Sequence, residues 1–271
     1  MSRQSLSEAV GPEVQRAIRA RLRAIEREER VWIVYAVESG SRAWGFASAD
    51  SDYDVRFLYV RPRDWYLTID AERKRDVIER PISDDLDLSG WDLRKALGLF
   101  RKSNPPLLEW LQSPLVYVED GPVAEQMRAL LPTHYAPRAC FYHYLSMARN
   151  NARSYLRGET VQHKKYFYVL RPLLACRWIA EARGPVPMEF EVLVRAMLDD
   201  AAVTEEIVDL IAQKRVGLEA ERGPRLPAIH AFVEAELEKL GKEADGLRTP
   251  ETVLGPLNQL FRSTLDAFDQ R

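Results

Sequence analysis

Two carboxylates separated by one residue are the most chemically suggestive feature of this sequence. Asp52 and Asp54 begin a hydrophobic stretch that runs to Val60, and a spacer of ten residues separates them from Gly40-Ser41. Side chains at positions i and i+2 of a β-strand point to the same face, so the two carboxylates would converge. Like charges that close repel each other unless a cation lies between them or water surrounds both. Asp-x-Asp alone is therefore typical of a solvated strand end, and only its sequence context can indicate a metal site.

The small-residue turn before these aspartates supplies that context. Gly40 has no side chain and lets the backbone approach a ligand closely. Ser41 offers a hydroxyl and a backbone N–H to phosphate oxygens, and Arg42 adds a charge-assisted donor. Paired carboxylates suit a hard cation such as Mg²⁺, so turn and carboxylates together predict a site for a magnesium-chelated nucleoside triphosphate.

Hydrophobic patterning indicates which elements position these groups. Residues 7–29 carry apolar side chains at helical spacing, and helices are also expected from Leu93 and over 107–111. Ser89-Gly90 is expected to end the strand before Leu93. Runs of β-branched and apolar residues predict strands over 31–37, 54–60, 76–79, 86–88 and 116–118.

The pattern of apolar residues changes after Pro122, where helical periodicity dominates and no convincing strand is visible. The expected helices span 123–131, 137–157, 161–182, 188–198, 203–221, 228–241 and 250–269. The change predicts two domains. Residues 1–120 would form an α/β (α+β) catalytic domain with a small mixed sheet, and residues 121–271 an all-helical domain that contributes to NTP and acceptor binding.

The composition is that of an ordinary globular protein, with 46% hydrophobic and 30% charged residues. The formal net charge of −2 is no nucleic-acid signature, so any such surface must be local. Cys140 and Cys176 fit no metal spacing, and we interpret them as buried thiols. Because no apolar run approaches the ~18 residues of a membrane span and the N-terminus lacks a signal-peptide pattern, we expect a cytoplasmic protein without a membrane partner.

The order Gly40-Ser41, spacer, Asp52-Tyr53-Asp54-Val55 resembles the signature of the DNA polymerase β-type nucleotidyltransferase superfamily. Further strings are closer still to one branch, the YcgL-type predicted nucleotidyltransferases of the RNA-repair pathway. These strings are residues 38–46, 51–57, 88–95 and 102–110, and the resemblance extends over residues 31–175. It implies a nucleotidyltransferase core and a two-metal reaction.

The superfamily uses a third carboxylate on a later strand, and Leu86-Asp87-Leu88 matches its hydrophobic–acidic–hydrophobic pattern. Asp85 is the alternative, because it lies two residues earlier on the same expected strand face. The resemblance implies that Asp52, Asp54 and Asp87 are the catalytic and metal-binding residues. They would hold two Mg²⁺ ions, with Mn²⁺ as an alternative, and Asp87 would accept the proton of the attacking hydroxyl. Such ions assist in-line displacement at the α-phosphorus, and pyrophosphate leaves.

A basic and aromatic cluster occupies residues 163–168, with Arg171 one turn further on. On a helix, Lys164, Tyr168 and Arg171 share one face, which could meet the β- and γ-phosphates while Tyr168 stacks on the base or ribose. The alternative is a helix whose aromatics pack in the core and whose lysines face water. The resemblance favours NTP binding by Lys164, Lys165, Tyr168 and Arg171, and Pro172 is expected to kink this helix or to end its first segment.

The leading functional interpretation is Mg²⁺-dependent transfer of a nucleoside monophosphate from an NTP to a hydroxyl acceptor. RNA is the preferred acceptor on the resemblance alone, in RNA repair or 3′-end addition. A small molecule of antibiotic type or a protein side chain is an alternative acceptor, since a fold does not determine the acceptor. A non-catalytic NTP-binding module is a further alternative, and the intact Gly40-Ser41, Asp52 and Asp54 argue against it.

Overall fold

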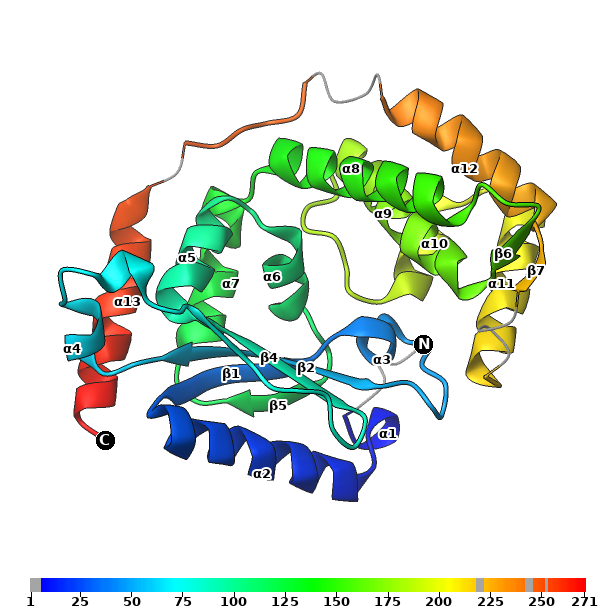
Figure 1. Ribbon diagram of the computed structural model, residues 1–271. Helices are drawn as coiled ribbons and strands as arrows, with labels where there is room; N and C mark the ends of the chain where they lie inside the picture. The colour runs from blue at the N-terminus through cyan, green and yellow to red at the C-terminus, as the bar shows by residue number, and fades with distance from the viewer. Residues whose placement is uncertain (1–5, 218–221, 242–245, 252) are drawn as a thin grey trace. The chain divides into compact units, whose positions relative to one another are not determined.

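The computed structural model describes residues 6–217, 222–241, 246–251 and 253–271 (Figure 1). It contains a five-stranded mixed sheet, a two-stranded sheet and many helices, which confirms the predicted α/β class. The chain forms two compact units. The sheet unit comprises the described parts of Met1–Ala43, Asp52–His134 and Pro250–Arg271, and the helical unit those of Trp44–Ser51 and Tyr135–Thr249.

The five-stranded sheet is built from strands that the sequence analysis located within a few residues. Its order is β3-β4-β2-β1-β5, in which β2 and β4 run parallel and the other neighbours run antiparallel. The strands are β1 (Trp32–Glu38), β2 (Tyr53–Val60), β3 (Val77–Glu79), β4 (Leu86–Asp92) and β5 (Val116–Glu119). The parallel pair is important for function, because it places the first residues of β2 and β4 at the same edge of the sheet.

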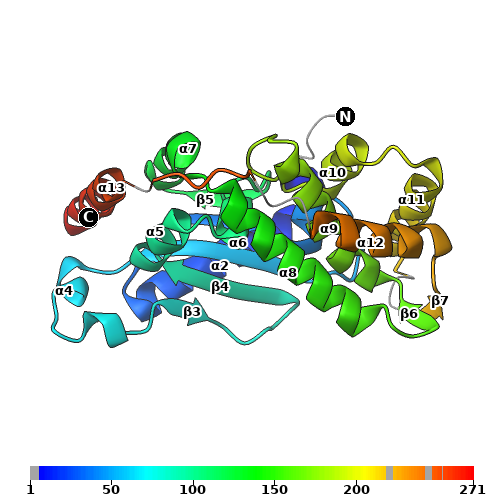
Figure 2. The same ribbon diagram turned by 90° about the horizontal axis from the view of Figure 1, so that it is seen from above.

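Helix α2 (Pro12–Glu29) covers one face of this sheet (Figures 1 and 2). Ile18, Leu22 and Ile25 lie on its buried stripe and join a core cluster with Val55, Phe57, Leu86 and Leu88. Side chains alternate between the two faces of a strand, so the residues between these apolar positions, including Asp54 and Asp87, belong to the opposite face.

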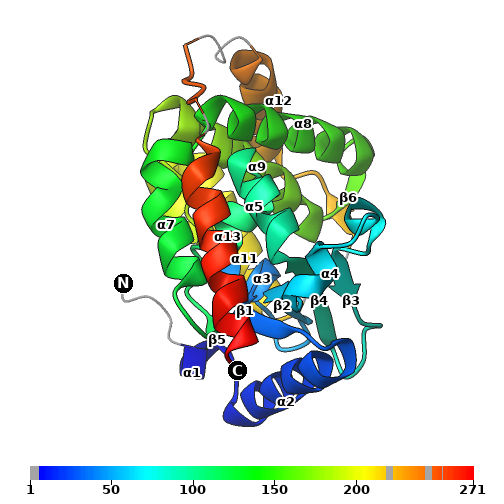
Figure 3. The same cartoon turned by 90° about the vertical axis from the view of Figure 1, so that its left-hand side faces the viewer.

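The remaining helices of the sheet unit include a distant segment of the chain. They are α1 (Leu6–Ala9), α3 (Gly40–Trp44, whose last residue belongs to the helical unit), α4 (Arg63–Tyr66), α5 (Leu93–Arg101), α6 (Pro105–Trp110), α7 (Val123–His134) and α13 (Leu254–Asp269), with a 3₁₀ turn at Ala71–Arg73. Helix α13 lies beside α5 and α7 (Figure 3). His134 Nε2 lies 3.0 Å from the carbonyl oxygen of Val253, and Leu257, Leu260 and Leu265 are buried.

The helical unit is built around the pair α8 and α9, which pack along each other (Figure 2). Its elements are α8 (Pro137–Tyr155), β6 (Thr160–Gln162), α9 (Lys164–Ala180), α10 (Phe190–Met197), α11 (Ala201–Arg215), β7 (Arg222–Pro224) and α12 (Pro227–Leu240). Helix α9 is buried on most of its circumference and continues through Pro172, so this proline does not end its first segment. The antiparallel pair β6–β7 was not expected, because strands of three residues are too short to show a period.

Strand β4 is longer than expected and continues through Ser89-Gly90. A Cβ atom on Gly90 would lie 2.1 Å from Cε2 of Phe57. The glycine is therefore required by the phenylalanine ring on the neighbouring strand, and it does not mark a turn. This requirement depends on the register of β2 against β4, which a single strand does not reveal.

Two expectations drawn from composition can be compared with the structure. Cys140 and Cys176 are both free and buried, as expected. Within the described ranges, no helix has both the length and the apolar character needed to cross a membrane.

Candidate active site

The parallel pairing of β2 with β4 places Asp54 directly beside Asp87, as Cα partners. Both side chains belong to the sheet face opposite α2, and each is about a third exposed. Asp52 is exposed just before the first residue of β2. The sheet therefore brings together two of the three predicted catalytic carboxylates, with the third at the same edge.

A guanidinium group that the sequence analysis missed connects Asp54 and Asp87. Nη2 of Arg56 lies 3.0 Å from Asp54 Oδ1 and 2.7 Å from Asp87 Oδ2, and Nη1 donates to the Asp87 carbonyl oxygen at 2.9 Å. Because Nη2 contacts both carboxylates, the separation of Asp54 Oδ1 from Asp87 Oδ2 cannot exceed the sum of the two Nη2–oxygen distances. That separation is therefore shorter than the span of about 6–7 Å that a metal-bridged pair of carboxylates allows.

The alternative third carboxylate, Asp85, lies in a turn outside β4. Asp84 and Asp85 both have positive φ, at 52° and 60°, and the Asp85 carbonyl oxygen accepts a hydrogen bond from the Tyr53 backbone N–H at 2.8 Å. The premise that Asp85 shares a strand face with Asp87 is therefore wrong. The signal that could have identified Arg56 is its spacing of two from Asp54 on one strand, which puts both on the same face.

The electrostatics of Asp54 favour a positive partner. Burial raises the pKa of its carboxyl group, and the neighbouring charges of Asp87 and Asp52 raise it further, whereas Arg56 and Arg42 lower it. A raised pKa means that the carboxylate lacks stabilisation of its negative charge. Additional positive charge at this point would therefore be bound favourably.

Glu38, the last residue of β1, binds the backbone of Asp54 and is a second site residue that the sequence pattern did not reveal. Its side chain is fully buried, Oε1 accepts a hydrogen bond from the Asp54 backbone N–H at 2.9 Å, and the Tyr117 hydroxyl donates to Oε2. Burial raises the pKa of Glu38 to about 7. Its position at the end of an otherwise apolar strand was the available signal, since a buried carboxyl group requires specific partners.

The Gly40-Ser41 segment packs directly against Asp54. Gly40 has φ of 59°, and a Cβ atom there would lie 2.0 Å from Asp54 Oδ2. The Ser39 N–H donates to the Asp54 carbonyl oxygen at 2.8 Å, and the guanidinium of Arg42 lies 3.9 Å from the centre of the Tyr53 ring. The expected turn is the beginning of the short helix α3, and the two halves of the motif meet at Asp54.

The predicted NTP-binding residues of α9 have different surroundings. Arg171 is only 3% exposed, donates to the carbonyl oxygens of Pro187 and Met188, and lies 4.9 Å over the Trp44 ring. Tyr168 is 42% exposed. These contacts give Arg171 a structural role in the helical unit, and its binding of NTP stays a prediction.

Lys164 and Lys165, the first two residues of α9, are both half-buried. The ammonium group of Lys165 lies over the rings of Tyr155 and Tyr168, at 4.4 and 5.1 Å. The structure thus places Lys165 beside the C-terminal end of α8, and NTP binding by the two lysines also stays a prediction.

The donor set at the β2–β4 edge can be tested for its fit to a metal ion. Among the residues that the structure describes, no group of three or more His, Cys, Asp or Glu side chains is arranged to hold one. The guanidinium of Arg56 supplies the positive charge between Asp54 and Asp87 in this arrangement. The chemistry of the donors nevertheless fits, because carboxylate oxygens are the ligands that Mg²⁺ prefers and Asp54 is short of positive charge.

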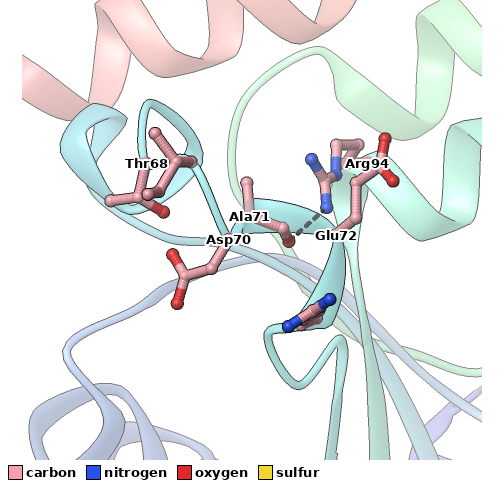
Figure 4. Close-up of a pocket in the computed structure, with 7 residues that line it drawn as sticks. Thr68, Asp70, Ala71, Glu72 and Arg94 are labelled. Carbon is pink, nitrogen blue, oxygen red and sulfur yellow. Dashed lines mark hydrogen bonds between the residues drawn. The ribbon is translucent and has the colours of Figure 1, made fainter.

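A cavity of 620 Å³ in the sheet unit lies elsewhere. It is lined by residues 68–73 and Arg94, and Figure 4 shows Arg94 reaching Ala71, to whose carbonyl oxygen it donates at 2.8 Å. These residues follow the C-terminal ends of β2 and β4, whereas Asp54 and Asp87 lie near the beginnings of those strands. The cavity is therefore separate from the carboxylates.

Comparisons with known proteins identify the family of this chain. The model of the RNA repair pathway DNA polymerase beta family matches residues 14–263. The uncharacterized protein YcgL of Bacillus subtilis (strain 168) is 50% identical over 246 residues, which cover 90% of this chain and 94% of that protein. The crystal structure of a nucleotidyltransferase-like protein from Exiguobacterium sibiricum 255-15 matches 93% of this chain and 91% of its own, at 14% identity and a TM-score of 0.33. On the family match and the close relative, the chain belongs to the RNA repair pathway DNA polymerase beta family.

Proposed function

We propose that the protein is a Mg²⁺-dependent nucleotidyltransferase that transfers a nucleoside monophosphate from an NTP to a hydroxyl group of RNA. The observation that carries the proposal is the side-by-side placement of Asp54 and Asp87 on parallel strands, with Gly40 seated against Asp54. Membership of a polymerase beta family of the RNA repair pathway supports both the reaction type and the choice of acceptor.

Asp52, Asp54 and Asp87 are the residues that would hold the metal ions. When bound, such ions lower the pKa of an attacking hydroxyl and stabilise charge on the attacking and leaving oxygens. Asp87 would receive the proton of the acceptor hydroxyl at Oδ1, because Oδ2 is engaged by Arg56. Glu38 holds the backbone N–H of Asp54 and thereby orients the start of β2.

The NTP would lie along the segment that begins at Gly40. The absence of a side chain there leaves room for the Asp54 carboxylate beside this segment, and Ser41 and Arg42, which follow Gly40 in the chain, would donate to the phosphates. Lys164, Tyr168 and Arg171 are the proposed contacts from α9, and Lys165 is considered separately below.

The test is transfer of label from α-³²P-labelled NTPs to pooled RNA in the presence of Mg²⁺. The wild-type protein should label RNA and release pyrophosphate, and Asp54→Asn should abolish both. Asp84→Asn is the matched control, because Asp84 is an exposed aspartate that pairs with Arg21 at the surface. Labelling of a protein or a small molecule in place of RNA would contradict the proposal that RNA is the acceptor. Absence of pyrophosphate release with every NTP and acceptor would contradict catalysis.

A further inference from the structure

We propose that the helical unit contains a binding pocket for one backbone phosphate group of RNA, formed by Arg157, Lys165 and Arg222. The pocket is a cavity of 160 Å³ between the C-terminal end of α8, the ribbon β6–β7 and the first turn of α9. Three further lining residues, Ser154, Tyr155 and Thr160, carry hydroxyl groups. Every side-chain charge on this lining is positive.

Within the described part of the chain, no carboxylate neutralises these three cations. Among the described residues, none of them forms an ion pair with a carboxylate: Lys165 lies over the Tyr155 ring, and Arg222 donates to the Thr160 carbonyl oxygen at 2.8 Å. Positive charges that surround one small cavity repel each other, and an anion in the cavity relieves that repulsion. The pocket therefore selects for negative charge.

The walls of the pocket are held in place by a fourth arginine that does not line it. Arg225 donates to the carbonyl oxygens of Gly158 and Arg157, at 2.7 Å each. The hydrogen bonds from Arg225 therefore satisfy these two carbonyl oxygens and hold the backbone between α8 and β6 in place. The pairing of Thr160 with Pro224 fixes the register of the adjoining ribbon β6–β7. The site thus exists before any ligand arrives, which reduces the ordering that binding requires.

Size and chemistry together identify the ligand group. Pockets that enclose a whole drug-sized ligand measure about 300–1,000 Å³, so this cavity accepts one small group and leaves the rest of the ligand outside. Guanidinium, ammonium and hydroxyl donors around a small volume match the oxygens of a phosphate.

The exposed rings beside the pocket favour a polynucleotide over an isolated phosphate. Tyr155 and Tyr168 are 38% and 42% exposed, and both lie next to the Lys165 ammonium group. Aromatic faces beside a positive groove are the combination that binds single-stranded nucleic acid, since bases stack while phosphates are neutralised. The identity of the ligand as RNA rests on the proposed function, whereas the phosphate chemistry rests on the pocket itself.

The test measures binding of a fluorescently labelled single-stranded RNA to the full-length protein by anisotropy over a range of salt concentrations. The double variant Arg157→Gln/Arg222→Gln should weaken binding by about tenfold or more. The slope of log K against log salt should become shallower by about 0.7, the value for one lost phosphate contact in single strands. The single variant Lys165→Gln should show a smaller loss in the same direction.

The matched control is Arg138→Gln/Arg183→Gln, which removes the same charge from exposed arginines of the same unit that lie outside the pocket. Equal weakening by both double variants would overturn the pocket as a specific site. ATP binding, measured in parallel, should be unchanged in Arg157→Gln/Arg222→Gln. Loss of ATP binding with RNA binding retained would overturn RNA as the source of the phosphate. Selective loss of RNA binding in a protein that transfers no nucleotide would uphold the pocket and refute only the proposed function.

Discussion

Arg56 determines the charge balance of the candidate active site, because one guanidinium contacts two carboxylates that otherwise repel each other. Its side chain is only 19% exposed, so water screens these charges incompletely. A site in which two anions share one fixed cation is ready to accept another positive charge at its open side. The residue thus links the stability of the strand pair β2–β4 to the electrostatics of the reaction.

Replacing Arg56 with Met should leave Asp54 and Asp87 adjacent without their shared counter-charge. We expect a loss of about 1–3 kcal/mol in the free energy of unfolding, as for hydrogen bonds to charged groups. Added Mg²⁺ should restore more stability to the variant than to the wild type. Urea denaturation with and without Mg²⁺ measures both effects. Arg19→Met, at an exposed position on α2, is the control, and an identical response of the two variants to Mg²⁺ would contradict this account.

Replacing Gly40 with Ala should disturb Asp54 specifically. The new Cβ atom would lie 2.0 Å from Asp54 Oδ2, so the carboxylate must move. We expect the nucleotidyl-transfer rate to fall by about tenfold or more, as for a misplaced catalytic group.

Gly45→Ala provides the comparison, because Gly45 also has positive φ but a Cβ atom there would meet nothing within 4 Å. Both variants should lose about 1–2 kcal/mol of stability from backbone strain. Only Gly40→Ala should lose activity in the transfer assay. Equal loss of activity in both variants would show that strain, and not the contact with Asp54, explains the effect.

Strands β2 and β4 are the elements on which the site depends, and the sequence predicted them unequally. The apolar run of β2 was sufficient to locate it. Strand β4 was expected to end at Ser89-Gly90, because a glycine in a short strand usually marks a break. The register that places Gly90 against Phe57 is a property of the pair, and no local pattern contains it.

Replacing Gly90 with Ala should test this contact between strands. The Cβ atom would lie 2.1–2.4 Å from three ring carbons of Phe57, so ring and strand must shift. We expect a loss of about 1–3 kcal/mol in the free energy of unfolding, as for other overpacked sites.

Gly98→Ala is the matched control in α5, where a Cβ atom would meet nothing within 4 Å. This substitution should stabilise the protein by up to about 1 kcal/mol, because alanine favours a helix over glycine. Urea denaturation curves measure both effects. A Gly90→Ala variant with an unchanged free energy of unfolding would contradict the assigned register.

At the scale of the whole molecule, the chain forms two units that are not contiguous in sequence. Residues 44–51, between Gly40-Ser41 and Asp52, belong to the helical unit, and α13 belongs to the sheet unit. Sequence periodicity identified α13 as a helix but could not assign its partners. Asp52, Asp54 and Asp87 could be singled out from residue types and spacing, whereas the sequence offers only the strand positions of Arg56 and Glu38 and not their partners. Their roles arise from register and burial, which are tertiary properties.

The pH dependence of stability should carry the signature of Glu38. Its pKa is raised from 4.5 to about 7 in the folded protein, so between these values the folded state binds a proton that the unfolded state has released. Stability from this group is therefore greatest below about pH 4.5 and falls as the pH rises towards 7, by about 3 kcal/mol.

Glu38→Gln mimics the protonated side chain and should remove this part of the pH dependence. Urea denaturation of the two proteins between pH 5 and about pH 8 compares the slopes. Parallel pH profiles for the variant and the wild type would contradict the assignment to Glu38.

The most direct measurement of the central claim compares Asp87→Asn with Asp85→Asn in the transfer of α-³²P label from NTP to RNA. Asp87 lies beside Asp54 on paired strands, and Asp85 lies in the preceding turn. We predict that Asp87→Asn lowers the transfer rate by at least about a hundredfold, the scale of a lost catalytic base, while Asp85→Asn changes it by no more than about threefold. Full activity of Asp87→Asn, or abolished activity of Asp85→Asn alone, would contradict the proposed carboxylate site.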